Sequence, residues 1–126
     1  MNNRQLVEMA VAAKEFSYSP YSKFRVGAAL LCEDGSVFTG CNIENAAYGP
    51  SVCAERVAIL KAISEGNKNF KKIAIVVDTK EPAYPCGVCR QVMSEFAPNM
   101  EILLSGSSGD ITKTSLKELM PHQFSL

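Results

Sequence analysis

The sequence predicts one α/β domain in which a mixed β-sheet is covered by helices on both faces. The patterns run in the order helix, hairpin, then alternating helices and strands, which is the order that builds such layers. Residues 73–77 form a short unbroken apolar run, typical of a strand covered on both faces. The length of 126 residues corresponds to a single domain, and neither a linker nor an internal repeat divides residues 1–126.

The first half of the chain is expected to form a helix, a hairpin and a loop. Apolar residues recur at helical spacing from Leu6 to Phe16, and the pattern ends before Pro20. Alternating apolar residues then predict a strand, Asp34-Gly35 is a hairpin turn signal, and a partner strand follows. A glycine–proline pair marks the next segment as a loop. The expected ranges are 3–17 for the helix, 24–32 and 37–42 for the strands, and 45–52 for the loop.

The second half of the chain is expected to alternate helices with strands. A helix-favouring segment follows the loop and ends at Gly66, a natural helix C-cap. A third helix begins near Gly87 and stops before Pro98. The expected ranges are 54–65, 87–96 and 116–120 for the helices, and 73–77, 102–104 and 111–114 for the strands.

The composition limits the possible partners. Lys and Arg total 13, as do Asp and Glu, and the resulting net charge of zero argues against a nucleic-acid partner. No apolar run approaches the ~20 residues that a membrane span needs, and the first residues lack the apolar core of a signal peptide. We therefore expect a cytoplasmic protein without nucleic-acid or membrane partners. Five cysteines, an odd number, do not suggest a disulfide framework in that compartment, so some of them need another role.

Three of the cysteines are expected to converge. Cys53 lies at the start of the second expected helix, and Cys86 and Cys89 lie at the start of the third. The helix that follows Cys53 runs away from this end, and the next strand brings the chain back, so both helix starts are expected at one edge of the sheet. Cys86 and Cys89 are three residues apart and share one face of a helical turn.

Three converging thiols predict a zinc ion, because helix N-termini favour thiolates and no fourth protein ligand is evident. A zinc site with three protein ligands and one open position is the catalytic type, whereas structural sites have four ligands. Glu55 lies two residues after Cys53 and is the expected general base beside the open position.

The same cysteines fit two other kinds of site. Cys86-x-x-Cys89 in a βα setting could be a redox dithiol, but a dithiol needs neither a third thiol nor an adjacent carboxylate. A structural zinc site would need a fourth ligand, for which the candidates are Cys32, Cys41 and His122. Both of these cysteines are expected to be small buried apolar residues, and His122 is expected at the surface.

These residues resemble a known family. Cys53-Ala54-Glu55 together with residues 85–89 (Pro-Cys-Gly-Val-Cys) resembles the signature of zinc deaminases. Residues 24–30 (Phe-Arg-Val-Gly-Ala-Ala-Leu) and 40–46 (Gly-Cys-Asn-Ile-Glu-Asn-Ala) resemble the small, all-cysteine cytidine deaminases, and the match runs from the first helix to Phe124. Blasticidin-S deaminases share the zinc half but not the Asn-Ile-Glu-Asn segment, and they are the alternative enzyme.

The resemblance implies a three-layer α/β/α sandwich and a reaction that converts cytidine or 2′-deoxycytidine to the uridine and ammonia, as in pyrimidine salvage. It implies one Zn²⁺ per chain and a homotetramer with shared active sites. The matching positions imply substrate contacts: Asn42 and Glu44 to the ribose hydroxyls, Phe24 beside the nucleoside, the Ala54 backbone to the pyrimidine ring, and Tyr48 and Phe124 reaching a neighbour's site.

The charge of the expected site predicts two further properties. Zn²⁺ with three thiolates carries about −1, so the pKa of Glu55 should rise toward the value that suits a group acting first as base and then as acid. Zinc is also a weaker Lewis acid with three thiolates, so a nearby cation should offset the charge. Arg56 is the expected hydrogen-bond donor to the ligand sulfurs, and Arg90 is a weaker candidate.

Overall fold

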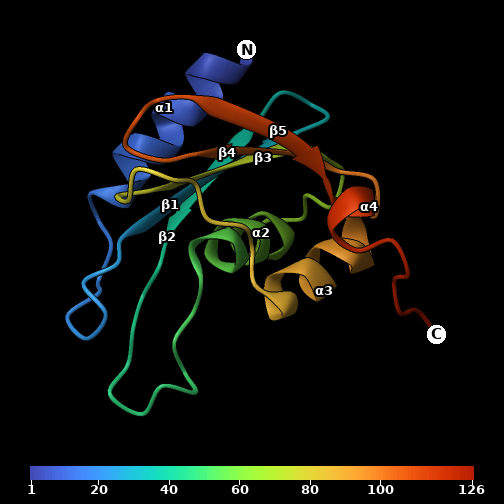
Figure 1. Ribbon diagram of the computed structural model, residues 1–126. Helices are drawn as coiled ribbons and strands as arrows, with labels where there is room; N and C mark the ends of the chain where they lie inside the picture. Colours follow the sequence, from blue (N-terminus) through green and yellow to red (C-terminus); the bar gives the residue numbers. More distant parts are fainter.

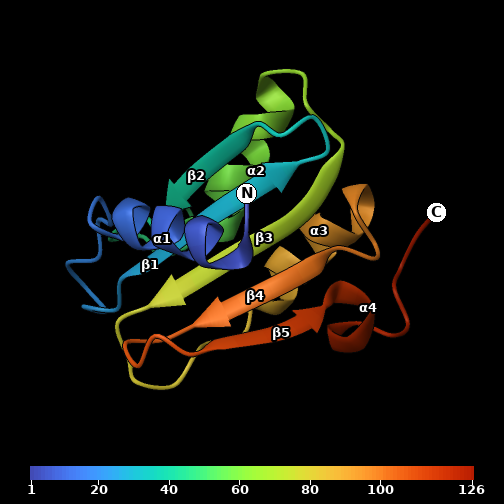
Figure 2. The same ribbon diagram turned by 90° about the horizontal axis from the view of Figure 1, so that it is seen from above.

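The computed structural model describes residues 1–126 and places five strands in one sheet, in the order β2-β1-β3-β4-β5 (Figures 1 and 2). The strands are β1 (Val26–Cys32), β2 (Val37–Cys41), β3 (Phe70–Val77), β4 (Glu101–Ser105) and β5 (Ile111–Ser115). The helices are α1 (Asn3–Lys14), α2 (Ala54–Ser64), α3 (Gly87–Phe96) and α4 (Leu116–Leu119).

The sheet is mixed, as predicted. β3 and β4 form its parallel pair, which the α3 crossover connects, and the other neighbouring pairs are antiparallel. Val26, the first residue of β1, pairs with Val77, the last residue of β3. The segment before β1 and the loop after β3 therefore leave the sheet side by side, and this edge is where the candidate site forms.

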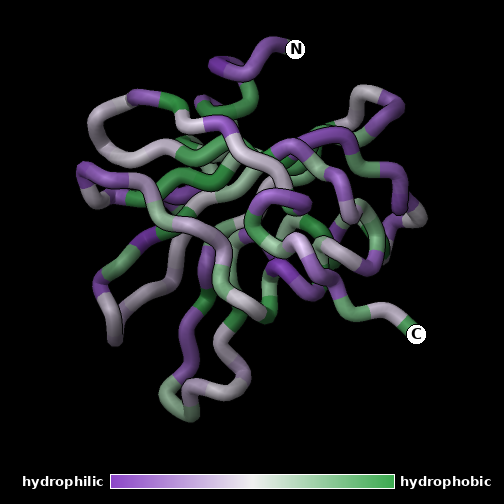
Figure 3. Tube along the Cα trace, turned by 45° about the vertical axis from the view of Figure 1, so that its right-hand side comes forward, coloured by the Kyte–Doolittle hydropathy of each residue, from purple (hydrophilic) through white to green (hydrophobic).

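Helices cover both faces of the sheet, which gives the predicted three layers (Figure 1). One cluster of 17 buried residues fills the space between the sheet and α2, α3 and α4, and a second cluster of 8 lies between the sheet and α1. Figure 3 shows hydrophobic segments gathered in the strands and hydrophilic ones in the outer turns. None of the helices combines the length and the apolar character needed to cross a membrane.

Two glycines let the helices lie directly on the strands. A Cβ at Gly27 of β1 would lie 2.0 Å from the carbonyl oxygen of Ala10 in α1. A Cβ at Gly40 of β2 would lie 2.5 Å from the carbonyl oxygen of Ala54 in α2. Such distances are far below van der Waals contact, so a side chain at either position would push a helix off the sheet. Gly40 thereby sets the position of the first turn of α2.

The structure differs from the predicted elements mainly at their ends. The first helix ends at Lys14, not residue 17, because the chain turns so that the N–H of Tyr18 can donate to the carbonyl of Asn42. Phe16, expected on the apolar face of this helix, is consequently 81% exposed. Cys41 was expected to be buried but is only half-buried, because β2 is an edge strand. Cys32 is buried and His122 is exposed, as expected.

Candidate metal centre and active site

The N-termini of two helices provide the three thiols. Cys53 is the N-cap residue of α2 and Cys86 is the N-cap residue of α3, and neither side chain makes a capping hydrogen bond. Cys89 lies in the first turn of α3 and is fully buried. The α2 and α3 helices lie side by side on the same face of the sheet (Figure 1). The predicted convergence of Cys53, Cys86 and Cys89 is therefore present, with the two cap thiols free for another ligand.

The spacing of the sulfur atoms fits a tetrahedral zinc ion. The Cys53 and Cys86 Sγ atoms are 3.8 Å apart, the Cys86 and Cys89 Sγ atoms are 3.5 Å apart, and all three lie within 4.8 Å of one another. Zn–S distances of about 2.3 Å in a tetrahedral site place neighbouring sulfurs about 3.8 Å apart. All five cysteines are free, so no disulfide competes for these thiols.

The three thiols do not share charge equally. Hydrogen bonds from the Cys89 thiol and from Arg56 lower the pKa of Cys53 to about 5. The pKa of Cys89 is raised, because its thiol donates to Cys53 and because it is buried. The cluster thus holds its first thiolate at Cys53. Neutral thiols lose their protons when a divalent cation binds them, so zinc binding here releases protons.

Glu55 is a buried carboxyl group beside this cluster. Its exposed fraction is 4%, and it occupies the first turn of α2. Burial, followed by the negative charge of Cys53, raises the pKa of Glu55 to about 6. A carboxyl group with such a pKa can both accept and donate a proton near neutral pH, which is what the sequence analysis expected of this residue.

The structure distinguishes between the two arginines that follow ligand cysteines. Arg56 Nη2 donates a hydrogen bond of 3.6 Å to Cys53 Sγ, and Arg56 Nε is buried without a hydrogen-bond partner. Arg90 instead donates to the carbonyl oxygens of Pro85 and Leu119, at 2.8 and 2.9 Å. Arg56 is thus the cation placed against the thiols, and Arg90 fastens α3 to α4.

A cavity of about 220 Å³ opens beside the thiols and Glu55. Most of its lining is apolar, which suits a flat heterocycle with the reactive groups at one end. Of the residues expected in the site, the cavity brings together Phe24, Asn42, Cys53, Ala54, Glu55 and Cys86. The other lining residues, which no sequence motif marked, are Val26, Ile75, Val77, Ala83 and Tyr84.

Of the residues expected to bind the sugar or to reach a neighbour's site, only Asn42 lines that cavity. Asn42 accepts a hydrogen bond from the N–H of Val26 at 2.9 Å and donates to the carbonyl of Phe24 at 2.7 Å. Glu44 lines an adjoining hollow together with Tyr48, which is 75% exposed. Phe124, in the C-terminal segment, is 67% exposed and does not line the cavity. Within one chain, Tyr48 and Phe124 do not reach the thiols and Glu55.

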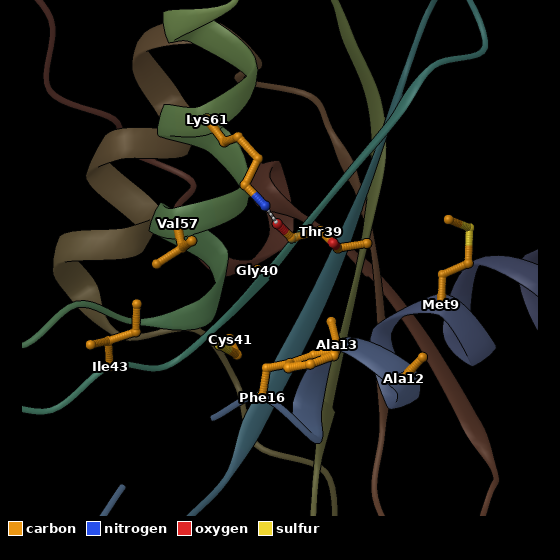
Figure 4. Close-up of a pocket in the computed structure, with 10 residues that line it drawn as sticks. All are labelled: Met9, Ala12, Ala13, Phe16, Thr39, Gly40, Cys41, Ile43, Val57 and Lys61. Carbon is orange, nitrogen blue, oxygen red and sulfur yellow. Dashed lines mark hydrogen bonds between the residues drawn. The ribbon is translucent and has the colours of Figure 1, made fainter. Parts of the chain in front are cut away.

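A separate apolar groove, lined by residues of α1, β2 and α2, carries none of this chemistry. Figure 4 shows side chains of α1 and α2 on either side of β2, with Cys41 between them. The dashed line in Figure 4 marks the hydrogen bond that Lys61 Nζ donates to the carbonyl oxygen of Thr39, at 2.5 Å. The groove is therefore an apolar surface feature beside the edge strand, separate from the metal centre.

The fold and the site together define a class of protein: an α/β/α domain with three thiols at adjoining helix N-termini and a buried glutamate, the arrangement of zinc-dependent deaminases. Residues 1–104 match the family model of the "Cytidine and deoxycytidylate deaminase zinc-binding region". The chain belongs to this family, and zinc is its cofactor.

Individual relatives agree with this assignment. A cytidine deaminase of Halalkalibacterium halodurans is 50% identical over 98% of this chain and 95% of its own length. A crystal structure of a cytidine deaminase from Burkholderia pseudomallei is similar with a TM-score of 0.95 and 48% identity, covering 98% of this chain and 100% of that one. A Blasticidin-S deaminase of Bacillus cereus is 34% identical over 95% of this chain and 90% of its own length, a more distant similarity.

Proposed function

We propose that this protein catalyses the hydrolytic deamination of cytidine and 2′-deoxycytidine to uridine and 2′-deoxyuridine with release of ammonia. The observation that carries the proposal is the placement of buried Glu55, with a pKa of about 6, beside three thiols and an apolar cavity. The relatives named cytidine deaminase, at up to 50% identity, support this substrate over blasticidin S. Such a reaction would serve pyrimidine salvage in the cytoplasm.

Cys53, Cys86 and Cys89 are the proposed zinc ligands, and bound zinc would supply Lewis acidity toward a water molecule. Glu55 takes a proton from the attacking water, whose oxygen bonds to C4 of the pyrimidine. Glu55 then delivers that proton to N3, takes a second proton from the new hydroxyl group on C4 and passes it to the amino group, so that ammonia leaves as the C4–N bond breaks and the C4=O bond forms. A carboxyl pKa near 6 suits both the uptake and the delivery of a proton.

The remaining residues are proposed to hold the nucleoside. The ring of Phe24 lies beside the base, and the Ala54 backbone contacts the pyrimidine ring. Asn42 and Glu44 bind the ribose hydroxyls, because an ionised carboxylate and an amide offer the acceptors and donors that hydroxyl groups need. The zero net charge favours a free nucleoside over a polynucleotide, which would require a positively charged track.

Arg56 is proposed to offset the charge of three thiolates. Its hydrogen bond to Cys53 Sγ draws electron density from the sulfur and so keeps bound zinc a stronger Lewis acid. The buried Nε has no hydrogen-bond partner, so this guanidinium keeps an N–H for a second acceptor, which supports the proposed role.

We also propose a homotetramer in which Tyr48 and Phe124 of one copy complete the site of another. Both side chains are large, exposed and unable to contribute to their own cavity. The apolar groove beside β2, which includes the exposed ring of Phe16, supports an association between copies.

One assay tests the reaction directly. Purified protein is incubated with cytidine while the ultraviolet change and the release of ammonia are followed, with blasticidin S as the comparison substrate. We expect turnover of cytidine, and turnover of blasticidin S alone would contradict the proposed substrate. A zinc determination on the same sample should give about one ion per chain, and full zinc occupancy in Cys86→Ala would contradict the ligand set.

A further inference from the structure

Residues of a short turn before β1 donate hydrogen bonds to the carboxylate of Glu44. Its Oε1 accepts the backbone N–H groups of Tyr21 at 3.0 Å and Ser22 at 3.1 Å, and its Oε2 accepts the hydroxyl of Ser22. These bonds, the Ser22 hydroxyl first, lower the pKa of Glu44 and hold it as an ionised acceptor. A carboxylate has about four lone-pair sites, so one remains for a hydroxyl group of a ligand.

The Ser22 hydroxyl makes a second bond that leads to the cavity. Its oxygen accepts the N–H of Phe24 at 3.0 Å, while the carbonyl of Phe24 accepts from Asn42 Nδ2 at 2.7 Å. Both backbone polar groups of Phe24 are therefore bound by side chains, and Phe24 lines the cavity. The residue proposed to lie beside the base is thus linked to both residues proposed to hold the sugar.

The turn needs these hydrogen bonds, because one of its residues has an unfavourable backbone conformation. Lys23, between Ser22 and Phe24, has φ of 60°, in the left-handed region that residues with a Cβ rarely adopt. The conformation costs about 1–2 kcal/mol, which the surrounding contacts must offset. The bonds of Ser22 to Glu44 and Phe24 are those contacts on either side of Lys23, together with the bond from the N–H of Lys23 to the carbonyl of Ser19.

We propose that Ser22 is a positioning residue: its hydroxyl couples the carboxylate of Glu44 to the backbone of Phe24. The residue that binds the sugar and the residue beside the base are therefore held in place by the same hydroxyl group. The inference rests on the proposed function, in which Glu44 binds a sugar hydroxyl, and adds a residue to it. Loss of the Ser22 hydroxyl frees one oxygen of Glu44 to rotate and leaves the N–H of Phe24 without its acceptor.

The kinetic test compares two substrates that differ in one hydroxyl. Ser22→Ala should raise the KM for 2′-deoxycytidine about 10- to 100-fold, the effect of a hydrogen bond to a charged group, while kcat changes little. Ser22→Thr restores the hydroxyl and should restore the KM. For 2′,3′-dideoxycytidine, which lacks the 3′-hydroxyl, the Ser22→Ala effect should shrink severalfold, because Glu44 has less to hold.

A matched control and a double variant isolate the coupling. Ser36 also donates its hydroxyl to a carboxylate, that of Asp34 at 2.6 Å, but in the hairpin at the opposite end of β1. Ser36→Ala should leave both KM values unchanged. In a Glu44→Gln background, Ser22→Ala should add little to the KM for 2′-deoxycytidine. An equal rise in KM for both substrates would show that Ser22 only shapes the turn and would overturn the coupling.

Amide hydrogen exchange tests the linkage without substrate. Ser22→Ala and Glu44→Gln should both speed exchange of the Phe24 N–H severalfold, whereas Ser22→Thr should not. Unchanged exchange at Phe24 in Glu44→Gln would overturn the proposal even in an active enzyme. Failure of the wild type to turn over cytidine would instead refute the proposed function, and the exchange result would still decide whether Ser22 couples Glu44 to Phe24.

Discussion

Replacement of Glu55 by Gln should greatly reduce turnover and at the same time stabilise the zinc-free fold. The amide keeps the shape of the side chain but neither takes up nor delivers the proton, so turnover should fall by ~10²–10⁴, the usual range for loss of a general acid–base group. Zinc content should be unchanged, because Glu55 is not among the proposed ligands. The stability gain follows from the environment of the carboxyl group, which is only 4% exposed.

The size of that gain comes from the pKa. Burial raises the pKa of Glu55 from an ordinary value of 4.5 to about 6. Between these values the folded protein holds a proton that the unfolded chain has released, so stability falls as the pH rises through this window. Each tenfold change in acidity corresponds to about 1.4 kcal/mol, so the ionised carboxylate costs about 2 kcal/mol above pH 6.

Urea unfolding of zinc-free, reduced protein measures this difference; zinc is omitted because a bound cation would itself change the carboxyl pKa. At pH 7.5 Glu55→Gln should unfold with a free energy about 2 kcal/mol higher than wild type, a midpoint shift of about 1 M urea. The two proteins should converge at about pH 4. Equal stabilities at both pH values would refute the assigned pKa, and near-normal turnover would refute the proton-transfer role.

Three further variants test neighbouring parts of the reasoning. Arg56→Gln should cost about 10–100-fold in turnover or zinc affinity, and adding Cys53→His should recover part of the loss because it removes one negative charge. Wild-type zinc content and turnover in Arg56→Gln would refute the charge-offsetting role. Phe124→Ala should raise the KM for cytidine about tenfold without unfolding the protein, as expected for loss of aromatic stacking on a base. A wild-type protein that sediments as a monomer and has an unimpaired KM would contradict a shared site. Gly40→Ala should destabilise the fold by about 1–3 kcal/mol in urea unfolding and lower turnover, since its Cβ would meet the carbonyl of Ala54 at 2.5 Å; unchanged values for both would show that α2 shifts freely.

Much of the fold was predictable from local patterns. Helical spacing, the alternation in β1, the apolar run of β3 and the turn at Asp34-Gly35 that leads into β2 all reflect interactions within a few residues, and the structure confirms each element. The candidate metal centre was predictable for a related reason. The three cysteines lie at the starts of two helices, and the element order alone brings those starts to one edge of the sheet. The role of Glu55 was predictable from its place in the first turn of α2 alone.

The tertiary structure decided where individual side chains go. The sequence predicted Arg56 as the donor to the thiols and Arg90 as a weaker candidate, but the role of Arg90 was not predictable: it donates to the carbonyl of Leu119, 29 residues further on, because α4 packs against α3. The bonds that join Ser22, Glu44 and Phe24 likewise depend on a turn and a loop that meet only when β1 and β2 pair. Residue type and short-range spacing thus determine the elements and the reactive groups, whereas the direction of a side chain depends on partners distant in sequence, which only the folded chain brings into hydrogen-bonding distance.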